Sequence, residues 1–219
     1  MSDRYLLHFF IALYSSPTNW QLPETFASNR NSYFQIRAAQ VEDATGLTEV
    51  LADSFHSQEG VFGWAYPFLK LGIYEDLRNR LRSTTPNHIC LVAVKCDAQA
   101  AITDSTSSGL VAVIELSPRS NHAFSRDRTR CLYISNLAVR STYRRRGVAQ
   151  QLLLKCEQIA LSWGFQDLYL HVLENNYQAR QLYDKLGYQL EQIDFSWSGL
   201  LLRRPRQILL HKRLHNSAD

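Results

Sequence analysis

Apolar residues recur along the chain with two different periods, and short runs rich in Ser, Asn, Gly and Pro separate the periodic segments. A period of two residues is typical of a half-buried strand, and a period of about 3.6 residues is typical of a helix with one buried face. The first period predicts strands at Tyr33–Ala38, Ile89–Lys95, Leu110–Leu116, Cys131–Val139, Asp167–Leu173, Tyr188–Asp194 and Gln207–Leu214.

The second period predicts four helices between these strands. The helix that ends at Trp163 has an apolar residue at every third or fourth position from Val148 onward, and Gly164 is suited to end it. The element order β-α-α-β-β-β-α-β-α-β-β predicts an α/β domain (α+β layered) in which helices pack on both faces of a mixed sheet. The predicted helices are Glu42–Phe55, Pro67–Arg82, Val148–Trp163 and Asn176–Leu186.

The N-terminal part of the chain has a different character. Residues 1–32 show neither period and are rich in Ser, Asn and Pro, so we interpret them as an N-terminal arm on a domain that covers residues 33–219. Leu6–Tyr14 is apolar, but it is short and interrupted by His8, so a secretory signal is not predicted. No run reaches the roughly 18 apolar residues that a membrane-spanning helix needs.

Composition and charge add limits on compartment and partners. The 219 residues are 45% hydrophobic, which is enough for the core of one domain. The four cysteines form no C-x-x-C pair, which is typical of a reducing compartment: the cytoplasm, or the plastid stroma if the chain comes from a plant. His211 and His215 have no further ligand near them in the sequence, so no metal site is predicted. The net charge of +4 suits a phosphorylated ligand.

The strongest chemical signal is a basic turn that joins a strand to a helix, in the sequence Asn136-Leu-Ala-Val-Arg-Ser-Thr-Tyr-Arg-Arg-Arg-Gly-Val-Ala149. The first turn of a helix leaves backbone N–H groups unpaired and carries a positive partial charge, so such a place suits a diphosphate. Gly147 lets the backbone come close to that ligand. A basic surface turn that merely starts a helix is the alternative interpretation.

The pattern R-x-x-G-x-A at Arg144–Ala149 resembles the acetyl-CoA signature Q/R-x-x-G-x-G/A of the GCN5-related N-acetyltransferases, the GNAT family. The resemblance covers about Tyr33–Leu214 and implies a GNAT fold. That fold is a mixed, mostly antiparallel sheet of about seven strands flanked by helices, in which two strands splay apart to hold coenzyme A. A second segment is similar to the family's N-x-x-A-x-x-L-Y-x-x-x-G-F/Y through Asn176, Ala179, Leu182, Tyr183, Gly187 and Tyr188.

The resemblance also implies acetyl-CoA as co-substrate, and no metal. Its pantetheine arm is expected between the strands Cys131–Val139 and Asp167–Leu173, where it pairs with free backbone groups as an added strand would. The residues expected to bind coenzyme A are Leu137, Ala138, Val139, Arg144, Arg145, Arg146, Gly147, Val148, Ala149, Gln150, Glu174, Asn175, Asn176 and Tyr183.

Two further segments resemble particular subgroups of the GNAT family. Leu132-Tyr133-Ile134 and Leu170-His171-Val172 are similar to the L-Y-I and L-H-V of NatE-type protein Nα-acetyltransferases. This likeness implies that Tyr133 and His171 together remove the proton of the incoming amine, a task that suits a histidine near neutral pH. Tyr183 is the expected general acid for the departing thiolate. The segment Trp64–Leu81 looks like the plastid and cyanobacterial branch, which acetylates protein N-termini and, in several members, lysines.

The expected acceptor is therefore the α-amine of a protein or peptide N-terminus, with lysine ε-amines as further acceptors. An α-amino group has a pKa near ~7.8, against ~10.4 for lysine, so much more of it is neutral and able to attack near pH 7. Two alternatives stay open: an acetyltransferase for a small amine such as a polyamine or antibiotic, and a non-catalytic acyl-CoA-sensing module.

The sequence indicates no membrane and no specific nucleic acid as a partner, and it leaves the oligomeric state open. The basic segments Arg126–Arg130 and Arg203–Arg206 would be the contact patch of a nucleic-acid-binding module. No aromatic residues are interleaved with these arginines, as single-strand binding would require.

Overall fold

The computed structural model describes residues 34–55, 66–83, 85–95, 109–120, 130–193 and 206–215. Within these ranges seven strands form one sheet in the order β1-β2-β3-β4-β5-β7-β6, and every neighbouring pair is antiparallel except β4 and β5. The prediction of a mixed, mostly antiparallel sheet is confirmed. The strands are β1 Phe34–Ala38, β2 Ile89–Lys95, β3 Leu110–Ser120, β4 Arg130–Val139, β5 Asp167–Leu173, β6 Gln189–Ile193 and β7 Gln207–Arg213.

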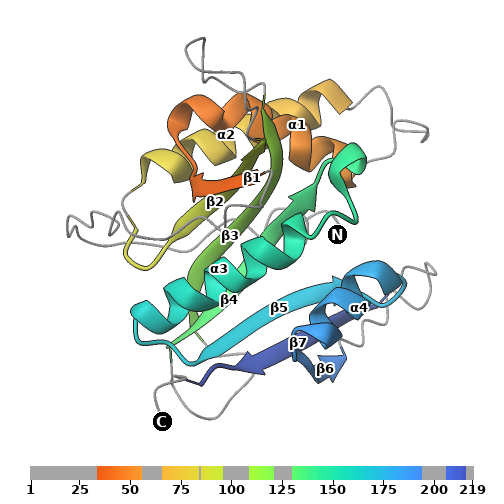
Figure 1. Ribbon diagram of the computed structural model, residues 1–219. Coiled ribbons are helices and arrows are strands. Elements are labelled where there is room, and N and C mark those ends of the chain that lie inside the picture. Colours follow the sequence, from red (N-terminus) through yellow and green to blue (C-terminus); the bar gives the residue numbers. More distant parts are fainter. Residues whose placement is uncertain are drawn as a thin grey trace, which may run out of the picture.

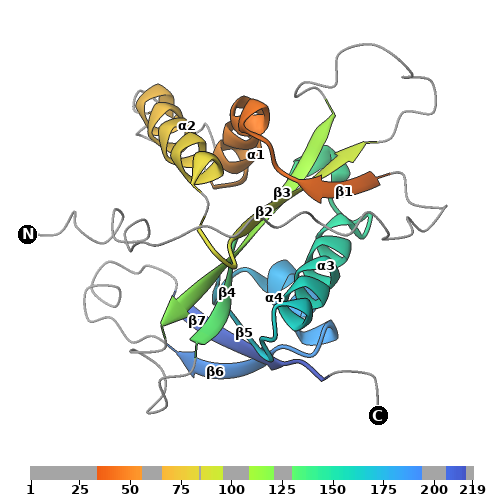
Figure 2. The ribbon, with the colours of Figure 1, turned by 90° about the vertical axis from the view of Figure 1, so that its left-hand side faces the viewer.

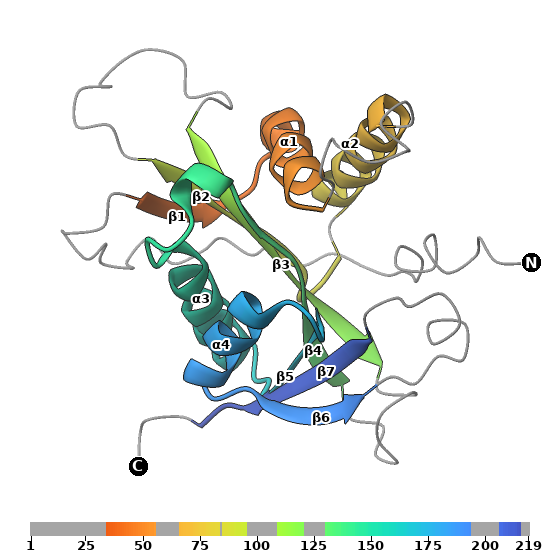
Figure 3. The same cartoon turned by 90° about the vertical axis from the view of Figure 1, so that its right-hand side faces the viewer.

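The four predicted helices are present, and they cover both faces of the sheet. Figure 2 and Figure 3, which view the molecule from opposite sides, show α1 and α2 on one face and α3 and α4 on the other. The predicted arm, residues 1–32, and the polar loop between β2 and β3 lie outside the described residues. The helices are α1 Ala44–Phe55, α2 Tyr66–Arg82, α3 Val148–Ser162 and α4 Tyr177–Lys185.

One strand of the sheet is longer than the sequence predicts, and the spatial order of the strands differs from their order in the chain. The strand β3 continues to Ser120, beyond the predicted end at Leu116, because its polar last residues pair with the start of β4. Polar residues give no strand signal by themselves, and the partner strand supplies the hydrogen bonds. The last strand, β7, lies between β5 and β6, so the chain order of the strands is not their spatial order.

Each face of the sheet has its own hydrophobic core. Under α3, a cluster that includes Leu152, Leu153 and Cys156 packs against alternate residues of β3, β4 and β5. Under α1 and α2, a second cluster contains Leu47 and Val50 and packs on the other face of β2 and β3. Each such side chain contributes about 1.5–3 kcal/mol when it is fully buried. The two cores fix the sheet between its helices and so hold the strands that carry the site.

The strand β4 contains a bulge at the point where it leaves β5. Two steps along β3, from Val113 to Glu115, correspond to three steps along β4, from Ala138 back to Ser135. Pairing between β4 and β5 ends at Ile134 and Leu170, and Figure 1 shows the two strands diverging beyond that point. A bulge bends the strand that carries the extra residue. The splayed strand pair expected from the resemblance is therefore present.

Candidate active site

A cavity of about 790 Å³ fills the space between the diverging strands. Its walls come from the end of β4, the basic turn, the start of α3, the end of β5 and one face of α4. Arg146, Glu174, Asn175 and Tyr133, although predicted for the site, do not line it. The predicted residues that line it are Leu137, Ala138, Val139, Arg144, Arg145, Gly147, Val148, Ala149, Gln150, His171, Asn176 and Tyr183.

On the side that faces β5, β4 has no paired strand after Ile134 among the described residues. Buried backbone N–H and C=O groups need hydrogen-bond partners, so this edge suits an extended ligand that carries amides of its own. At the far end, the carbonyl oxygen of Val139 accepts a hydrogen bond of 3.1 Å from Nε of Arg144. The free edge available to a pantetheine arm is therefore the stretch before Val139.

The basic turn presents an open helix N-terminus to the cavity. Gly147 stands at the N-cap of α3 with φ 79°, and no side chain caps the helix. A Cβ on Gly147 would meet nothing within 4 Å, so the space in front of the backbone is open. Arg145, with φ 63°, also has a left-handed conformation and turns the chain sharply before the helix. Uncapped N–H groups, positive charge and open space together fit a diphosphate.

The guanidinium group of Arg146 lies over the ring of Tyr143, with Cζ 5.4 Å from the ring centroid, rather than in the cavity wall.

The loop between β5 and α4 contains predicted site residues of which only one lines the cavity. Asn176 lines the cavity, and its Oδ1 accepts a hydrogen bond of 3.2 Å from the N–H of Ala179, which caps α4. Glu174 is exposed, and its N–H donates to the carbonyl oxygen of Arg206. Of these polar residues, only Asn176 faces the coenzyme A cavity.

Tyr133 and His171 meet across the last paired residues of β4 and β5. The hydroxyl of Tyr133 lies 2.7 Å from Nδ1 of His171, a hydrogen-bond distance in which either group can donate. His171 points away from the core that holds Leu170 and Val172, as the alternation along β5 predicts. The guanidinium of Arg119, on β3, lies 4.0 Å from the centroid of the Tyr133 ring.

Tyr183 lies on α4 and is almost fully buried, with 6% of its surface exposed. Burial, with a smaller effect from Tyr133, raises the pKa of Tyr183 to about 12. A phenol with such a pKa keeps its proton at neutral pH, and a general acid must do so before it can donate. The Tyr183 ring packs edge-on against that of Tyr188, with the centroids 5.8 Å apart. Tyr183 also lines the cavity.

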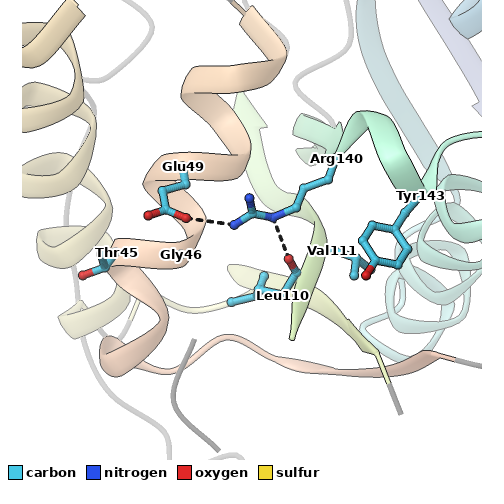
Figure 4. A pocket seen from close by; sticks show the side chains of 7 residues that line it. All are labelled: Thr45, Gly46, Glu49, Leu110, Val111, Arg140 and Tyr143. Atoms are coloured by element: carbon cyan, nitrogen blue, oxygen red, sulfur yellow. Dashed lines mark hydrogen bonds and ion pairs between the residues drawn. The ribbon is translucent and has the colours of Figure 1, made fainter. Parts of the chain in front are cut away.

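Sequence reasoning missed a second cavity of about 410 Å³ between α1 and the ends of β3 and β4. Figure 4 shows Arg140 as its central cation: Nε donates to the carbonyl oxygen of Leu110 at 2.8 Å, and Nη2 donates to Glu49 at 3.0 Å. Tyr143 lines both cavities. Arg140 therefore ties the start of the basic turn to α1. Nothing in the sequence separates this arginine from the basic run that follows it.

Other polar side chains that line the larger cavity also escaped the sequence analysis, because single polar residues on a strand or helix give no pattern of their own. They are Ser54, Ser135, Asn136, Gln178, Gln181 and Lys185.

His211 has two partners in the structure that are distant from it in the sequence. Its Nε2 lies 2.8 Å from Asp167, and its ring stacks on Tyr169. Within the described ranges no three His, Cys, Asp or Glu side chains gather in a way that could hold a metal ion. In the same part of the chain, no helix combines the length and apolar character needed to cross a membrane.

The sheet has one splayed strand pair, and a basic turn at a helix N-terminus lies beside the gap between those strands. This combination is typical of enzymes that use acyl-coenzyme A. Residues 55–188 match the profile of the Acetyltransferase (GNAT) family, and the chain belongs to that family.

The comparisons with individual proteins agree with this family. The chain is 30% identical over 166 residues to GCN5-related N-acetyltransferase 10, chloroplastic, from Arabidopsis thaliana, a match that covers 75% of this chain and 65% of the relative. The PaiA N-acetyltransferase of Thermoplasma acidophilum, solved with coenzyme A, has a TM-score of 0.58 and 23% identity, over 82% of this chain and 98% of its own. NAA60 of Arabidopsis thaliana, solved with acetyl-CoA, has a TM-score of 0.60 and 17% identity, over 84% and 99%. The chain thus spans less than two thirds of the plant relative's length, and the two solved structures share its fold.

Proposed function

We propose that the protein transfers the acetyl group of acetyl-CoA to the α-amine of protein or peptide N-termini, and more slowly to lysine ε-amines. The observation that carries this proposal is the 2.7 Å contact between the Tyr133 hydroxyl and Nδ1 of His171, a residue that lines the coenzyme A cavity. A base in that place acts on an amine that approaches the thioester from the face of the sheet opposite α3.

The reaction follows from direct attack in a ternary complex. The neutral amine nitrogen forms a bond to the thioester carbonyl carbon, and the carbon–sulfur bond breaks. The proton that the amine loses passes to the Tyr133–His171 pair, and the thiolate receives a proton from Tyr183. After the products leave, the Tyr133–His171 pair releases its proton to the solvent and Tyr183 takes one up from it, so both groups return to their starting states. The high pKa of Tyr183, about 12, suits this role because its conjugate base is readily reprotonated at neutral pH.

The choice of an α-amine rests on protonation. At pH 7.5 a sizeable fraction of α-amines is neutral, against about a thousandth of lysine side chains. A single histidine–tyrosine pair and a cavity wall without carboxylates do little to change that ratio. No Asp or Glu is found among the described residues that line the cavity, and a polyamine site would use such carboxylates.

The comparisons support acetyl transfer as the activity, whereas the choice of acceptor rests on the geometry of the site. At 23% and 17% identity, PaiA and NAA60 share a fold with this chain, and the fold alone hosts several acceptors. NAA60 has also been solved with a bisubstrate analogue. The word chloroplastic in the name of the plant relative supports the plastid stroma as the location, if the chain is a plant protein.

The proposal is tested by measuring thiol release from acetyl-CoA with a panel of acceptors. The panel holds peptides that start with Met, Ala, Ser or Thr, the same peptides with a blocked N-terminus and one internal lysine, and spermidine. We expect free N-termini to turn over fastest, blocked lysine peptides more slowly, and mass spectrometry to place the acetyl group on the α-nitrogen. Fastest turnover with spermidine would establish the small-amine alternative instead, and no turnover with any amine would favour the acyl-CoA sensor.

A further inference from the structure

A buried carboxylate that the proposed chemistry does not use lies in the middle of β3. The side chain of Glu115 is only 5% exposed, and three groups from other elements donate to it. Nη1 of Arg80, on α2, reaches both carboxylate oxygens at 2.8 and 2.7 Å. Nε2 of His88 lies 2.6 Å from Oε1, and Nδ2 of Asn136 donates to Oε2 at 2.6 Å.

The charge of Glu115 is retained by these partners. Burial alone would raise the pKa of Glu115, but the hydrogen bond from His88 and the positive charge of Arg80 outweigh it and hold that pKa below its ordinary value. An ionised carboxylate accepts hydrogen bonds only, so His88 must carry its proton on Nε2. Glu115 is thus an ionised hydrogen-bond acceptor in a fixed position, and it fixes the position of the Asn136 amide that donates to it.

Asn136 is the residue that connects this anchor to the coenzyme A cavity. It lies in the β4 bulge with φ 53°, a left-handed conformation that Asn tolerates better than most residues. Its backbone stands directly before the free edge that begins at Leu137. Its amide reaches back to β3, across the register shift between Val113 and Glu115. The shape of the free edge therefore depends on a side-chain bond to a neighbouring strand.

We propose that Glu115 and Asn136 are positioning residues for acetyl-CoA: their hydrogen bond holds the β4 bulge so that the edge at Leu137 and Ala138 faces the gap. Arg80 and His88 support the pair by keeping the Glu115 carboxylate charged and in place. The proposal concerns coenzyme A binding, which follows from the family, and it does not depend on which amine is the acceptor.

The test uses the full chain and coenzyme A as the calorimetric probe. Asn136→Gly removes the amide but keeps the left-handed conformation accessible. The matched control is Asn87→Gly, because Asn87 also has a positive φ, 57°, and stands in the turn before β2, outside the cavity wall. We expect Asn136→Gly to weaken coenzyme A binding about tenfold, the loss typical of one misplaced hydrogen-bonding group, and Asn87→Gly to leave it unchanged.

Asn136 itself lines the cavity, so a second variant separates positioning from direct contact. Glu115→Gln changes a residue outside the cavity wall, and we expect it to weaken coenzyme A binding as well, with no further loss in the double variant. In steady-state kinetics, KM for acetyl-CoA should rise while KM for the peptide stays constant. Wild-type affinity in Asn136→Gly would overturn the proposal, as would wild-type affinity in a folded Glu115→Gln or an equal rise in both KM values. If Glu115→Gln does not fold, Glu115→Asp takes its place, because it keeps the charge but draws the carboxylate away from Asn136, and it should weaken coenzyme A binding in the same way.

Discussion

At the scale of single residues, the site depends on two phenols in different surroundings. Tyr133 shares a hydrogen bond with a histidine, whereas Tyr183 is enclosed by α4 and the core and has its pKa raised to about 12. The same functional group can therefore assist proton removal in one place and proton donation in the other.

Replacing Tyr183 with Phe should lower kcat by about 10²–10⁴-fold, because the thiolate loses its proton donor as it departs. KM for acetyl-CoA should change far less, since the hydroxyl matters mainly in the transition state. Steady-state thiol-release kinetics measure both constants. Tyr188→Phe is the matched control: its ring touches that of Tyr183, but it does not line the cavity, so its kcat should remain near wild type. Full turnover in Tyr183→Phe would reduce Tyr183 to a packing residue.

For the proposed base, His171→Ala and Tyr133→Phe should each lower kcat/KM for a peptide amine by about 10²-fold or more. The double variant should lose less than the product of the single losses, because the two groups share one hydrogen bond. Coenzyme A affinity should survive both changes. In His171→Ala the acidic limb of the pH–rate profile should move up toward the amine's own pKa near ~7.8, since only amines that are already neutral can react.

A purely structural role for His171 has a different signature. The variant would then melt at a lower temperature but keep its rate per folded molecule and its pH profile. Melting temperature, measured beside the rate, therefore decides whether His171 belongs to the mechanism.

At the scale of elements, α3 offers a comparison between its two ends. Gly147 at its start and Gly164 just after its end both have positive φ, 79° and 81°, and a Cβ on either would meet nothing within 4 Å. The backbone strain of a substitution is therefore similar at both ends, about 1–2 kcal/mol. Only the first glycine faces the cavity.

Gly147→Glu should abolish coenzyme A binding in calorimetry, because it places bulk and negative charge where the diphosphate approaches the helix. Gly164→Glu should lose similar stability and bind coenzyme A with wild-type affinity. Unchanged affinity in a folded Gly147→Glu would refute the role of this turn as the diphosphate site.

The sequence predicted the elements best where burial is one-sided or complete. The bounds of β2 and β5 were predicted to the residue, because each is an apolar or alternating run between polar turns. The end of β3 was missed because its polar residues adopt a strand conformation only through their pairing with β4. In the site, motifs located the basic turn, and the resemblance selected the three proposed catalytic residues. The contact between Glu115 and Asn136 joins residues 21 positions apart across a register shift, which no local pattern encodes.

At the scale of the whole molecule, the edge strand β1 is attached to the rest of the fold by charge as well as by pairing. Nη1 and Nη2 of Arg37 donate to the two oxygens of Asp43 at 2.6 and 2.9 Å, and the backbone N–H of Gln40 donates to the same carboxylate. Burial alone would raise the pKa of Asp43, but the hydrogen bonds from Arg37 and Gln40 outweigh it and leave that pKa below its ordinary value.

A folded-state pKa below the ordinary value means that Asp43 stabilises the protein fully above about pH 4, and that this contribution disappears as the pH falls through the lowered pKa. Asp43→Asn should therefore cost about 1.5–3 kcal/mol of unfolding free energy at pH 7 and much less at pH 3. Urea unfolding at both pH values measures the difference. Glu42→Gln removes the same charge from the exposed neighbouring position and should change stability by less than about 0.5 kcal/mol. An equal loss for Asp43→Asn at pH 3 and pH 7 would contradict this account.

The place of β7 between β5 and β6 determines when the molecule can be completed during synthesis. In the sheet, β6 pairs with β7, which the ribosome makes later, so Gln189–Ile193 must wait for Gln207–Arg213 to leave the exit tunnel. Until then one side of β5, the strand that carries His171, also lacks its neighbour. Such unpaired edges are the parts of a nascent chain that associate wrongly with other chains. A nascent chain stalled before Gln207 would therefore expose one edge of β5 and leave β6 without its partner, although every described residue of the larger cavity wall would already have been made.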